Sequence, residues 1–135
     1  MRITADTNLL VRVIVRDNVR QAEIALRVLE LADAVFVPLP CICEFVWVLD
    51  SIYALPRDRV AKSIRALVFR ANIVVDRTAV SAGLRLLDSG GDFADGVIAS
   101  AGMAMGAETF VSFDRKAVAR LDQMGISARH PGDFA

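Results

Sequence analysis

The sequence DFADGVIASAGMAMGAETFVSFD, residues 92–114, contains the pattern that decides the fold. Small and apolar residues at helical spacing predict a helix over its first half, and Gly106 is the kind of residue that commonly ends one. Residues 108–113 are rich in β-branched and aromatic side chains, which favour a strand. Asp114 follows where that strand is expected to end. The stretch therefore predicts a helix, a glycine turn, a strand and an acid at the strand's end.

Two acids and a hydroxyl of this stretch are expected to serve one site. Asp95 falls in the first turn of the predicted helix. Its face of that helix carries small and apolar side chains, namely Ile98, Ala99 and Gly102. A carboxylate on a packing face is unusual, so we interpret Asp95 as functional. Ser112 and Asp114 are expected on the same side of the strand, because side chains in a strand repeat every two residues.

Strands and helices alternate along the whole chain. Strands are expected at residues 2–5, 34–39, 72–76, 108–113 and 126–129. Helices are expected at residues 9–16, 19–31, 41–53, 56–70, 78–88, 93–106 and 115–124. The alternation predicts an α/β protein with a mostly parallel central sheet of four to five strands between two layers of helices. With 135 residues, 55% of them hydrophobic, we expect a single domain over residues 1–135.

Composition and charge argue against several classes of protein. The formal net charge is zero, so no overall field indicates a nucleic-acid-binding protein. No run approaches the roughly 18 apolar residues of a membrane helix, and the N-terminus lacks the pattern of a signal peptide. Cys41 and Cys43 are too close for an easy disulfide, so we interpret them as buried, reduced thiols. These features together predict a cytoplasmic protein.

Four acids are expected at one edge of the predicted sheet. In parallel sheets, ligands bind beyond the carboxyl ends of the strands. The acids expected there are Asp6, Glu44, Asp95 and Asp114. Four neighbouring carboxylates repel each other unless a cation lies among them, and ligands that are all oxygens suit Mg²⁺ or Mn²⁺. The pattern therefore predicts metal-dependent hydrolysis of phosphodiesters.

Each of these acids also has a purely structural interpretation. Asp6-Thr-Asn8 can be simply a strand-to-helix turn in which Thr7 or Asn8 caps the helix, and Glu44 in a first helical turn is favoured by the helix dipole. Asp92 and Asp95 have the spacing of a capping box, and we assign Asp92 to capping. Asp114 can cap the last helix. No single acid is decisive, whereas the order and placement of the four together are.

Four short motifs carry a resemblance to a known family. They are Ala5-Asp-Thr-Asn8, Cys43-Glu-Phe-Val-Trp-Val-Leu49, Asp92-Phe-Ala-Asp-Gly-Val-Ile-Ala99 and Phe110-Val-Ser-Phe-Asp-Arg115. In this order the chain resembles the PIN domain, and more closely the VapC toxins of bacterial toxin–antitoxin pairs. The resemblance covers nearly the whole chain. It implies a PIN-like three-layer fold and a Mg²⁺- or Mn²⁺-dependent endoribonuclease.

The resemblance also implies roles for individual residues. The acidic metal site would be made by Asp6, Glu44, Asp95 and Asp114. Asn8 would hold Asp6 in place. Ser112 stands where the family usually has Thr, keeps the hydroxyl, and would orient a ligand or a metal-bound water.

Partners follow from the same resemblance. It implies an RNA substrate, a homodimer, and a VapB-like antitoxin whose C-terminal segment lies in an apolar groove and blocks the site. An apolar surplus fits such a groove, with Phe45, Trp47, Val48, Ile52 and Tyr53 close together in sequence. For phosphate contacts we expect Arg115 beside the site, and Arg12 with Arg16 on one helix face.

Two other functions remain open from the sequence. A receiver-like phosphoacceptor domain also has an α/β sheet and an acidic Mg²⁺ pocket. In that case Asp76 would be the phosphoacceptor, but Glu44 and Asp95 would have no role. The other alternative is a PIN-fold protein that binds RNA or a partner without cutting, which gives no reason to keep four mutually repelling carboxylates.

Overall fold

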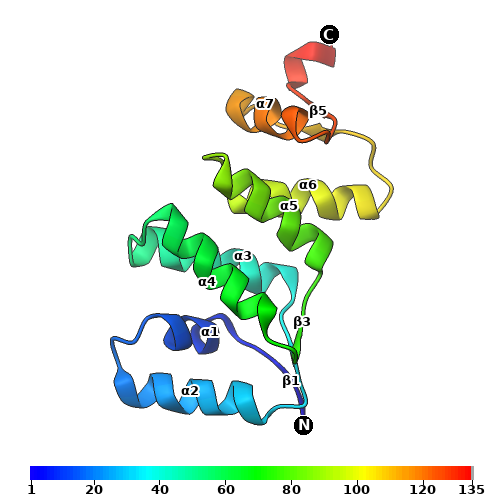
Figure 1. Cartoon of the computed structure of the whole chain (residues 1–135). Coiled ribbons are helices and arrows are strands. Elements are labelled where there is room, and N and C mark those ends of the chain that lie inside the picture. Colours follow the sequence, from blue (N-terminus) through cyan, green and yellow to red (C-terminus); the bar gives the residue numbers. More distant parts are fainter. Residues whose placement is uncertain (135) are drawn as a thin grey trace. The chain divides into compact units, whose positions relative to one another are not determined.

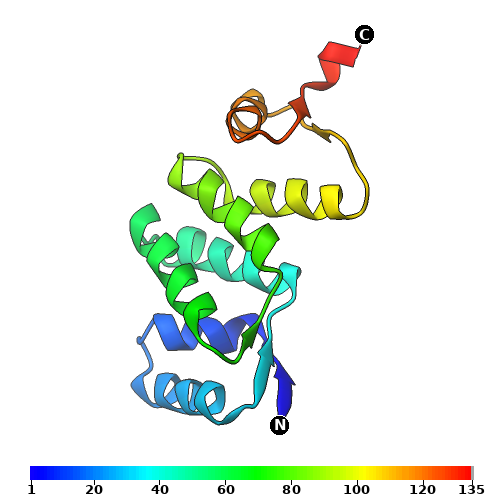
Figure 2. The same ribbon diagram turned by 45° about the vertical axis from the view of Figure 1, so that its right-hand side comes forward.

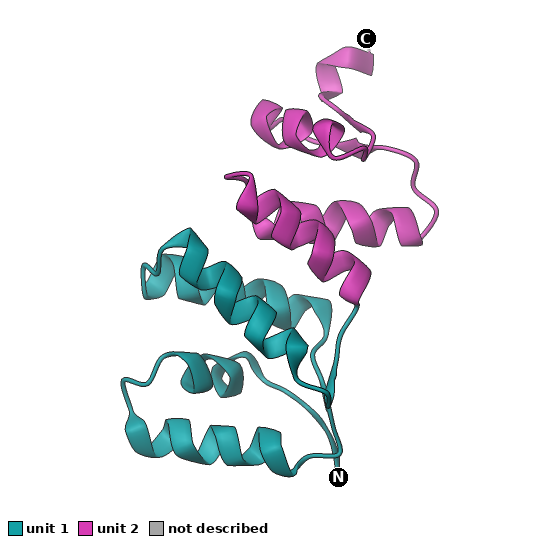
Figure 3. Cartoon of the chain, viewed as in Figure 1, with its two compact units in different colours: residues 1–76 teal, residues 77–135 magenta. Residues whose placement is uncertain are grey.

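The computed structural model describes residues 1–134. The chain forms two compact units, a first unit of residues 1–76 and a second unit from Arg77 onward (Figure 3). Each unit contains parallel strands joined by helices. Among the residues described, no helix combines the length and the apolar character that crossing a membrane requires.

The first unit is built around a three-stranded parallel sheet (Figure 1). Its strands are β1 (Arg2–Thr4), β2 (Ala34–Phe36) and β3 (Ile73–Val74), in the order β1-β2-β3. Its helices are α1 (Thr7–Ile14), α2 (Val19–Leu31), α3 (Leu39–Trp47) and α4 (Arg57–Phe69). A π-helical turn, η1 (Val48–Ile52), extends α3.

The central strand β2 gives this sheet its register. Val35 is opposite Ile3 on one side and Ile73 on the other. Val35 is fully buried, as expected of a parallel strand that is covered on both faces. The backbone pairing continues past the strand ends, where the Ala5 N–H donates to the Phe36 carbonyl at 2.9 Å.

Helix faces complete the core of the first unit. The largest side chains that are fully buried there are Leu10, Val11, Leu29, Val35, Ile42, Phe45, Leu49, Val60 and Ile64. Full burial of one such side chain contributes about 1.5–3 kcal/mol. The end of α2 is fixed by Asn72, whose side-chain amide donates to the carbonyls of Leu29 and Ala32 at 2.7 and 2.9 Å.

The second unit has a two-stranded parallel sheet and three α-helices among its described residues. Its helices are α5 (Arg77–Asp88), α6 (Phe93–Ala104) and α7 (Arg115–Gln123), followed by a 3₁₀ turn, η2 (Pro131–Phe134). Its strands are β4 (Phe110–Val111) and β5 (Ala128–Arg129). A small core joins these elements through Leu86, Ala99, Leu121 and Ala128.

Glycines let α5 and α6 lie very close together (Figure 2). A Cβ atom added at Gly96 would be 2.6 Å from the carbonyl oxygen of Ala82, which belongs to the backbone of α5. A Cβ added at Gly83 would be 2.7 Å from the buried ring of Phe93. Both positions therefore require glycine because of space. This close packing fixes the start of α6, the helix that carries Asp95.

The α/β class and the parallel strands expected from the sequence are confirmed. The strands are shorter than predicted. Helix bounds also differ, since α1 begins at Thr7 and ends at Ile14, before Arg16. Arg12 and Arg16 therefore do not share a helix face, contrary to the sequence prediction. Helix α3 begins at Leu39, two residues earlier than expected. Pro40 lies in its first turn, where a missing backbone N–H costs no hydrogen bond.

We predict that Gly96→Ala destabilises the protein by about 1–3 kcal/mol, because the added methyl group meets rigid backbone rather than a movable side chain. Gly102→Ala in the same helix is the matched control. Its nearest neighbour would be the Ala107 Cβ at 3.8 Å, so this change is expected to be neutral or to stabilise by up to about 1 kcal/mol. Equilibrium unfolding in urea measures both. Equal stability of the two variants would contradict the packing argument.

Candidate active site

Asp6 lies at the carboxyl end of β1, in the N-cap position of α1. Its backbone is extended, with φ −84° and ψ 153°, as expected of an N-cap residue. Its carboxylate nevertheless makes no capping hydrogen bond, and the side chain is exposed. Thr7 and Asn8, the caps expected from the sequence, lie inside α1, and the Asp6 carboxylate makes no capping bond and is available to a ligand.

Glu44 is the second acid of the first unit. It is the sixth residue of α3, beyond the first turn, and its side chain is exposed. The favourable interaction with a helix dipole is confined to the first turn. That interaction therefore does not account for Glu44, which is the single acid within α3.

Cys41 connects the start of α3 to the junction between β1 and α1. Its thiol donates to the Ala5 carbonyl over 3.4 Å and accepts from the Thr7 hydroxyl over 3.8 Å. Burial raises the pKa of the Cys41 thiol above its ordinary value, and the negative charges of Asp6 and Glu44 raise it further. Both acids therefore act electrostatically on the same thiol, which places them around one point of the first unit.

The second unit positions Asp95 in the first turn of α6, as predicted. Asp92 precedes it as the N-cap, and its carboxylate accepts the Ala94 N–H at 3.0 Å. The assignment of Asp92 to capping is thus confirmed. Asp95 is half-buried, and this burial raises the pKa of its carboxyl group. The nearby charges of Asp92 and Asp114 raise that pKa further.

Asp114 is held firmly at the start of α7. Its Oδ1 atom accepts the backbone N–H groups of Lys116 and Ala117, at 3.0 and 3.1 Å. The Ser112 hydroxyl accepts the N–H of Asp114 itself at 3.0 Å. Strand β4 ends at Val111, so this contact arises from a turn and not from strand alternation. The second oxygen of Asp114 takes no part in these bonds.

Each unit therefore brings two of the four predicted acids together. In the first unit the charges of Asp6 and Glu44 both raise the pKa of the Cys41 thiol, and in the second unit the charge of Asp114 raises the pKa of Asp95. Asn8 lines the same groove as Asp6, although no hydrogen bond joins their side chains within residues 1–134. Neither unit alone holds three or more potential metal ligands in one group among its described residues.

The donors present fit a hard divalent cation. All four predicted ligands are carboxylates, which suit Mg²⁺ or Mn²⁺ and not a soft metal. The Asp6 carboxylate has no capping role, and Asp95 is half-buried among like charges that oppose its ionisation. A bound cation would relieve both the repulsion and the cost of burying the Asp95 charge.

Sequence reasoning missed one polar network. The Arg12 guanidinium is held by Asp17 and Tyr53, five and 41 residues further along the chain. The sequence pattern assigns Tyr53 to an apolar surface and gives its hydroxyl no partner. The sequence gives one indication of where Arg12 lies. It is four residues after Asn8, so both side chains are on one face of α1.

Comparison with known proteins agrees with the residues described above. Residues 3–123 match the PIN domain family, and because that match spans most of the chain, the protein belongs to this family. PIN domains are generally nucleases and typically depend on Mg²⁺ or Mn²⁺. No curated protein sequence matches the chain significantly.

We predict that Asp95→Asn stabilises the metal-free protein at neutral pH. Burial and like charges raise the folded-state pKa of Asp95, so its ionised form destabilises the fold. This destabilisation is complete above the folded-state pKa and disappears as the pH falls through it. The gain in melting temperature should therefore disappear in acid.

Glu108→Gln, which removes an exposed acid from a loop of the same unit, is the control for this test. Thermal unfolding should show that Mn²⁺ stabilises the wild type and the Glu108 variant more than it stabilises Asp95→Asn. A gain at neutral pH that persists unchanged in acid would contradict the assigned cause.

Proposed function

We propose that this protein is a Mg²⁺- or Mn²⁺-dependent endoribonuclease, the VapC-type toxin of a toxin–antitoxin module. It would hydrolyse RNA phosphodiester bonds. The observation that carries the proposal is the match to the PIN family by a chain in which Asp6 and Asp95 stand at helix starts, with carboxylates that no capping bond uses. A structural role alone does not explain these two acids.

The proposal assigns the metal ligands to Asp6, Glu44, Asp95 and Asp114. A bound cation would activate water and neutralise charge on the phosphate. Ser112 acts through Asp114, because its hydroxyl accepts the Asp114 N–H and so fixes the backbone that presents this carboxylate. Asn8 lies on the groove beside Asp6, where its amide can orient RNA or the first carboxylate.

The partners proposed are RNA, a second copy of the chain and a VapB-like antitoxin, all in the cytoplasm. Exposed apolar side chains support an apolar partner surface. Trp47 is 59% exposed and Ile52 is 62% exposed, whereas Phe45 is fully buried in the core. Some of these apolar side chains therefore belong to the core and others are exposed. Trp47 and Ile52 are the exposed residues that favour a partner.

The receiver-like alternative loses its support. It assigns the phosphoacceptor role to Asp76, which follows β3, and leaves the acids of α3 and α6 without a role. The family match covers those two helices as well as Asp76. A PIN-fold protein that binds without cutting remains the alternative that the following experiment tests.

The test is cleavage of RNA by the purified protein, freed of any bound antitoxin. We expect discrete fragments with Mg²⁺ or Mn²⁺ and none with EDTA. Asp6→Asn and Asp95→Asn should each lower the rate by more than about 100-fold, since changes to residues that merely support metal ligands already cost about 10- to 100-fold. Glu108→Gln should cut like the wild type.

Two results would contradict the proposal. Cutting that survives EDTA or either substitution would mean a contaminant or a different site. Absence of cutting by folded, metal-loaded wild type across total cellular RNA would favour the protein that binds without cutting.

A further inference from the structure

A groove lies between α1 and α2 and begins at Asp6. Its volume is about 460 Å³, within the roughly 300–1,000 Å³ of typical small-ligand sites. Polar side chains from both helices line it, with apolar side chains between them. They include Asp6, Asn8, Arg12 and Gln21, with Leu9 and Ile24 as the apolar part.

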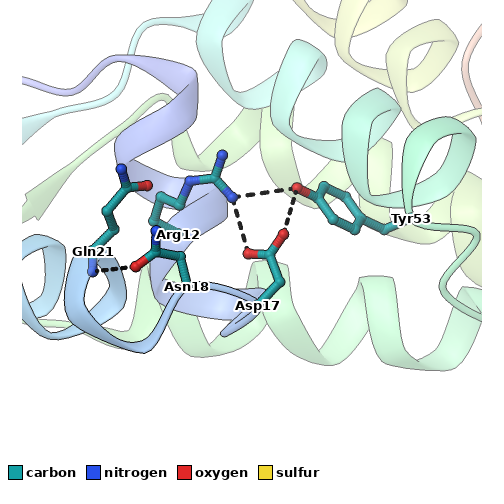
Figure 4. A network of polar contacts seen from close by, with 5 residues as sticks. All are labelled: Arg12, Asp17, Asn18, Gln21 and Tyr53. Carbon is teal, nitrogen blue, oxygen red and sulfur yellow. Dashed lines mark hydrogen bonds and ion pairs between the residues drawn. The ribbon is translucent and has the colours of Figure 1, made fainter.

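The guanidinium of Arg12 in this groove is held from one side (Figure 4). Its Nη1 atom donates to a carboxylate oxygen of Asp17 at 3.0 Å and to the Tyr53 hydroxyl at 3.4 Å. The Tyr53 hydroxyl donates in turn to the other Asp17 oxygen at 3.4 Å. Asp17 lies in the loop between α1 and α2, and Tyr53 directly follows η1. The closed triangle therefore fixes the orientation of the guanidinium.

The other edge of the Arg12 guanidinium remains available. No hydrogen bond within the described residues 1–134 uses its Nε or Nη2 atom, and Figure 4 shows Nη2 turned away from Asp17 and Tyr53. The hydrogen bond to Tyr53, followed by the charge of Asp17, keeps the pKa of Arg12 above its ordinary value. Arg12 thus presents a charged, oriented pair of donors, the geometry that matches a phosphate bidentately.

The rest of the groove matches the chemistry of a nucleotide. Asn8 and Arg12 are one helical turn apart, about 6 Å along α1, so the groove runs from the acid site toward the guanidinium. The amides of Asn8 and Gln21 offer both donors and acceptors, as base edges require. Leu9 and Ile24 provide apolar surface for the faces of an unstacked base.

We propose that this groove binds a nucleotide of single-stranded RNA next to the bond that is cut, with Arg12 contacting its phosphate. Asp17 and Tyr53 are positioning residues that act through Arg12. The inference rests on the proposed ribonuclease function and adds to it a specific substrate subsite. A phosphate contact of this kind fixes the register of the RNA without reading its sequence.

The test uses single-stranded RNA oligonucleotides that carry one cleavage site mapped with the wild type. Equilibrium binding is measured in an Asp95→Asn background, which does not cut. Arg12→Gln should weaken binding by about 10- to 100-fold, as expected for loss of a hydrogen-bonded charge. It should also reduce the slope of log K against log salt by about 0.7, the value for one phosphate contact on a single strand.

Arg20→Gln is the matched control. Arg20 is an exposed arginine of α2 outside the lining of the groove, so its loss removes the same charge from the same unit. We expect less than about a twofold effect on binding. A general weakening by lost positive charge would affect both variants alike and would overturn the inference.

Neutral methylphosphonate linkages locate the contact. Each oligonucleotide of a series carries one such linkage near the cleavage site. At one position, the neutral linkage should weaken binding of the oligonucleotide by the protein that retains Arg12. The same linkage should not change the affinity of the Arg12→Gln variant. Equal sensitivity of both proteins at every linkage would show that Arg12 contacts no phosphate.

Tyr53→Phe tests the positioning role, because it removes only the hydroxyl. It should weaken binding by about 3- to 10-fold with Arg12 intact and have no effect in the Arg12→Gln background, as expected for a group acting through Arg12. If Arg12→Gln does not fold, Arg12→Lys keeps the charge without the fork, and it should reduce the linkage-specific effect because lysine contacts a phosphate as a point charge and not bidentately.

The outcomes distinguish failure of the proposed subsite from failure of the proposed ribonuclease function. Wild type that cuts RNA normally, with Arg12→Gln binding like Arg20→Gln, would overturn the subsite and leave the nuclease intact. Arg12 would then serve only to fix the loop between α1 and α2, seen as a lower melting temperature. Wild type that neither cuts nor binds RNA would overturn the proposed function, and the subsite with it.

Discussion

Parallel pairing of short strands is the constraint on which the rest of the structure depends. When β1 and β2 run in the same direction, both end at the same edge of the sheet, and the chain must turn into a helix at each end. Helices α1 and α3 therefore begin side by side, and the Cys41 thiol of α3 reaches the carbonyl of Ala5, the residue that directly follows β1. The proximity of Asp6 to this thiol follows from strand direction, and Glu44 lies about one helical turn after Cys41 along α3.

Acids at helix starts divide into two kinds in this protein. Asp92 and Asp114 accept backbone N–H groups of the helices that they precede, so their presence is explained by the unsatisfied donors of a helix start. Asp6 occupies an N-cap position but makes no capping bond, and Asp95 lies in the first turn of α6, where Asp92 is already the cap. Asp114 combines both roles, since one oxygen caps α7 and the other remains available.

Local patterns in the sequence were enough for the α/β class, the parallel strands and the capping role of Asp92. They misplaced the start of α1, whose N-cap position is held by Asp6 and not by Thr7 or Asn8, and they could not show that the Asp6 side chain makes no capping bond, because that depends on its direction. The same limit applies to the half-burial of Asp95, because burial depends on which elements pack around the start of α6. The network of Arg12, Asp17 and Tyr53 joins residues 41 positions apart, and no pattern of short period records such a contact.

The number of residues in the π-helical turn η1 determines where the Tyr53 side chain points. The Tyr53 N–H bonds to the carbonyl of Val48, five residues back, so the turn contains one residue more than an α-helix would. One residue corresponds to about 100° of rotation around a helix axis. Loss of a single residue from 48–52 would restore regular helix and at the same time rotate the tyrosine away from Arg12. An insertion or deletion in this turn would therefore separate the Tyr53 hydroxyl from Arg12 and Asp17. All three residues of the network would still be present in the sequence.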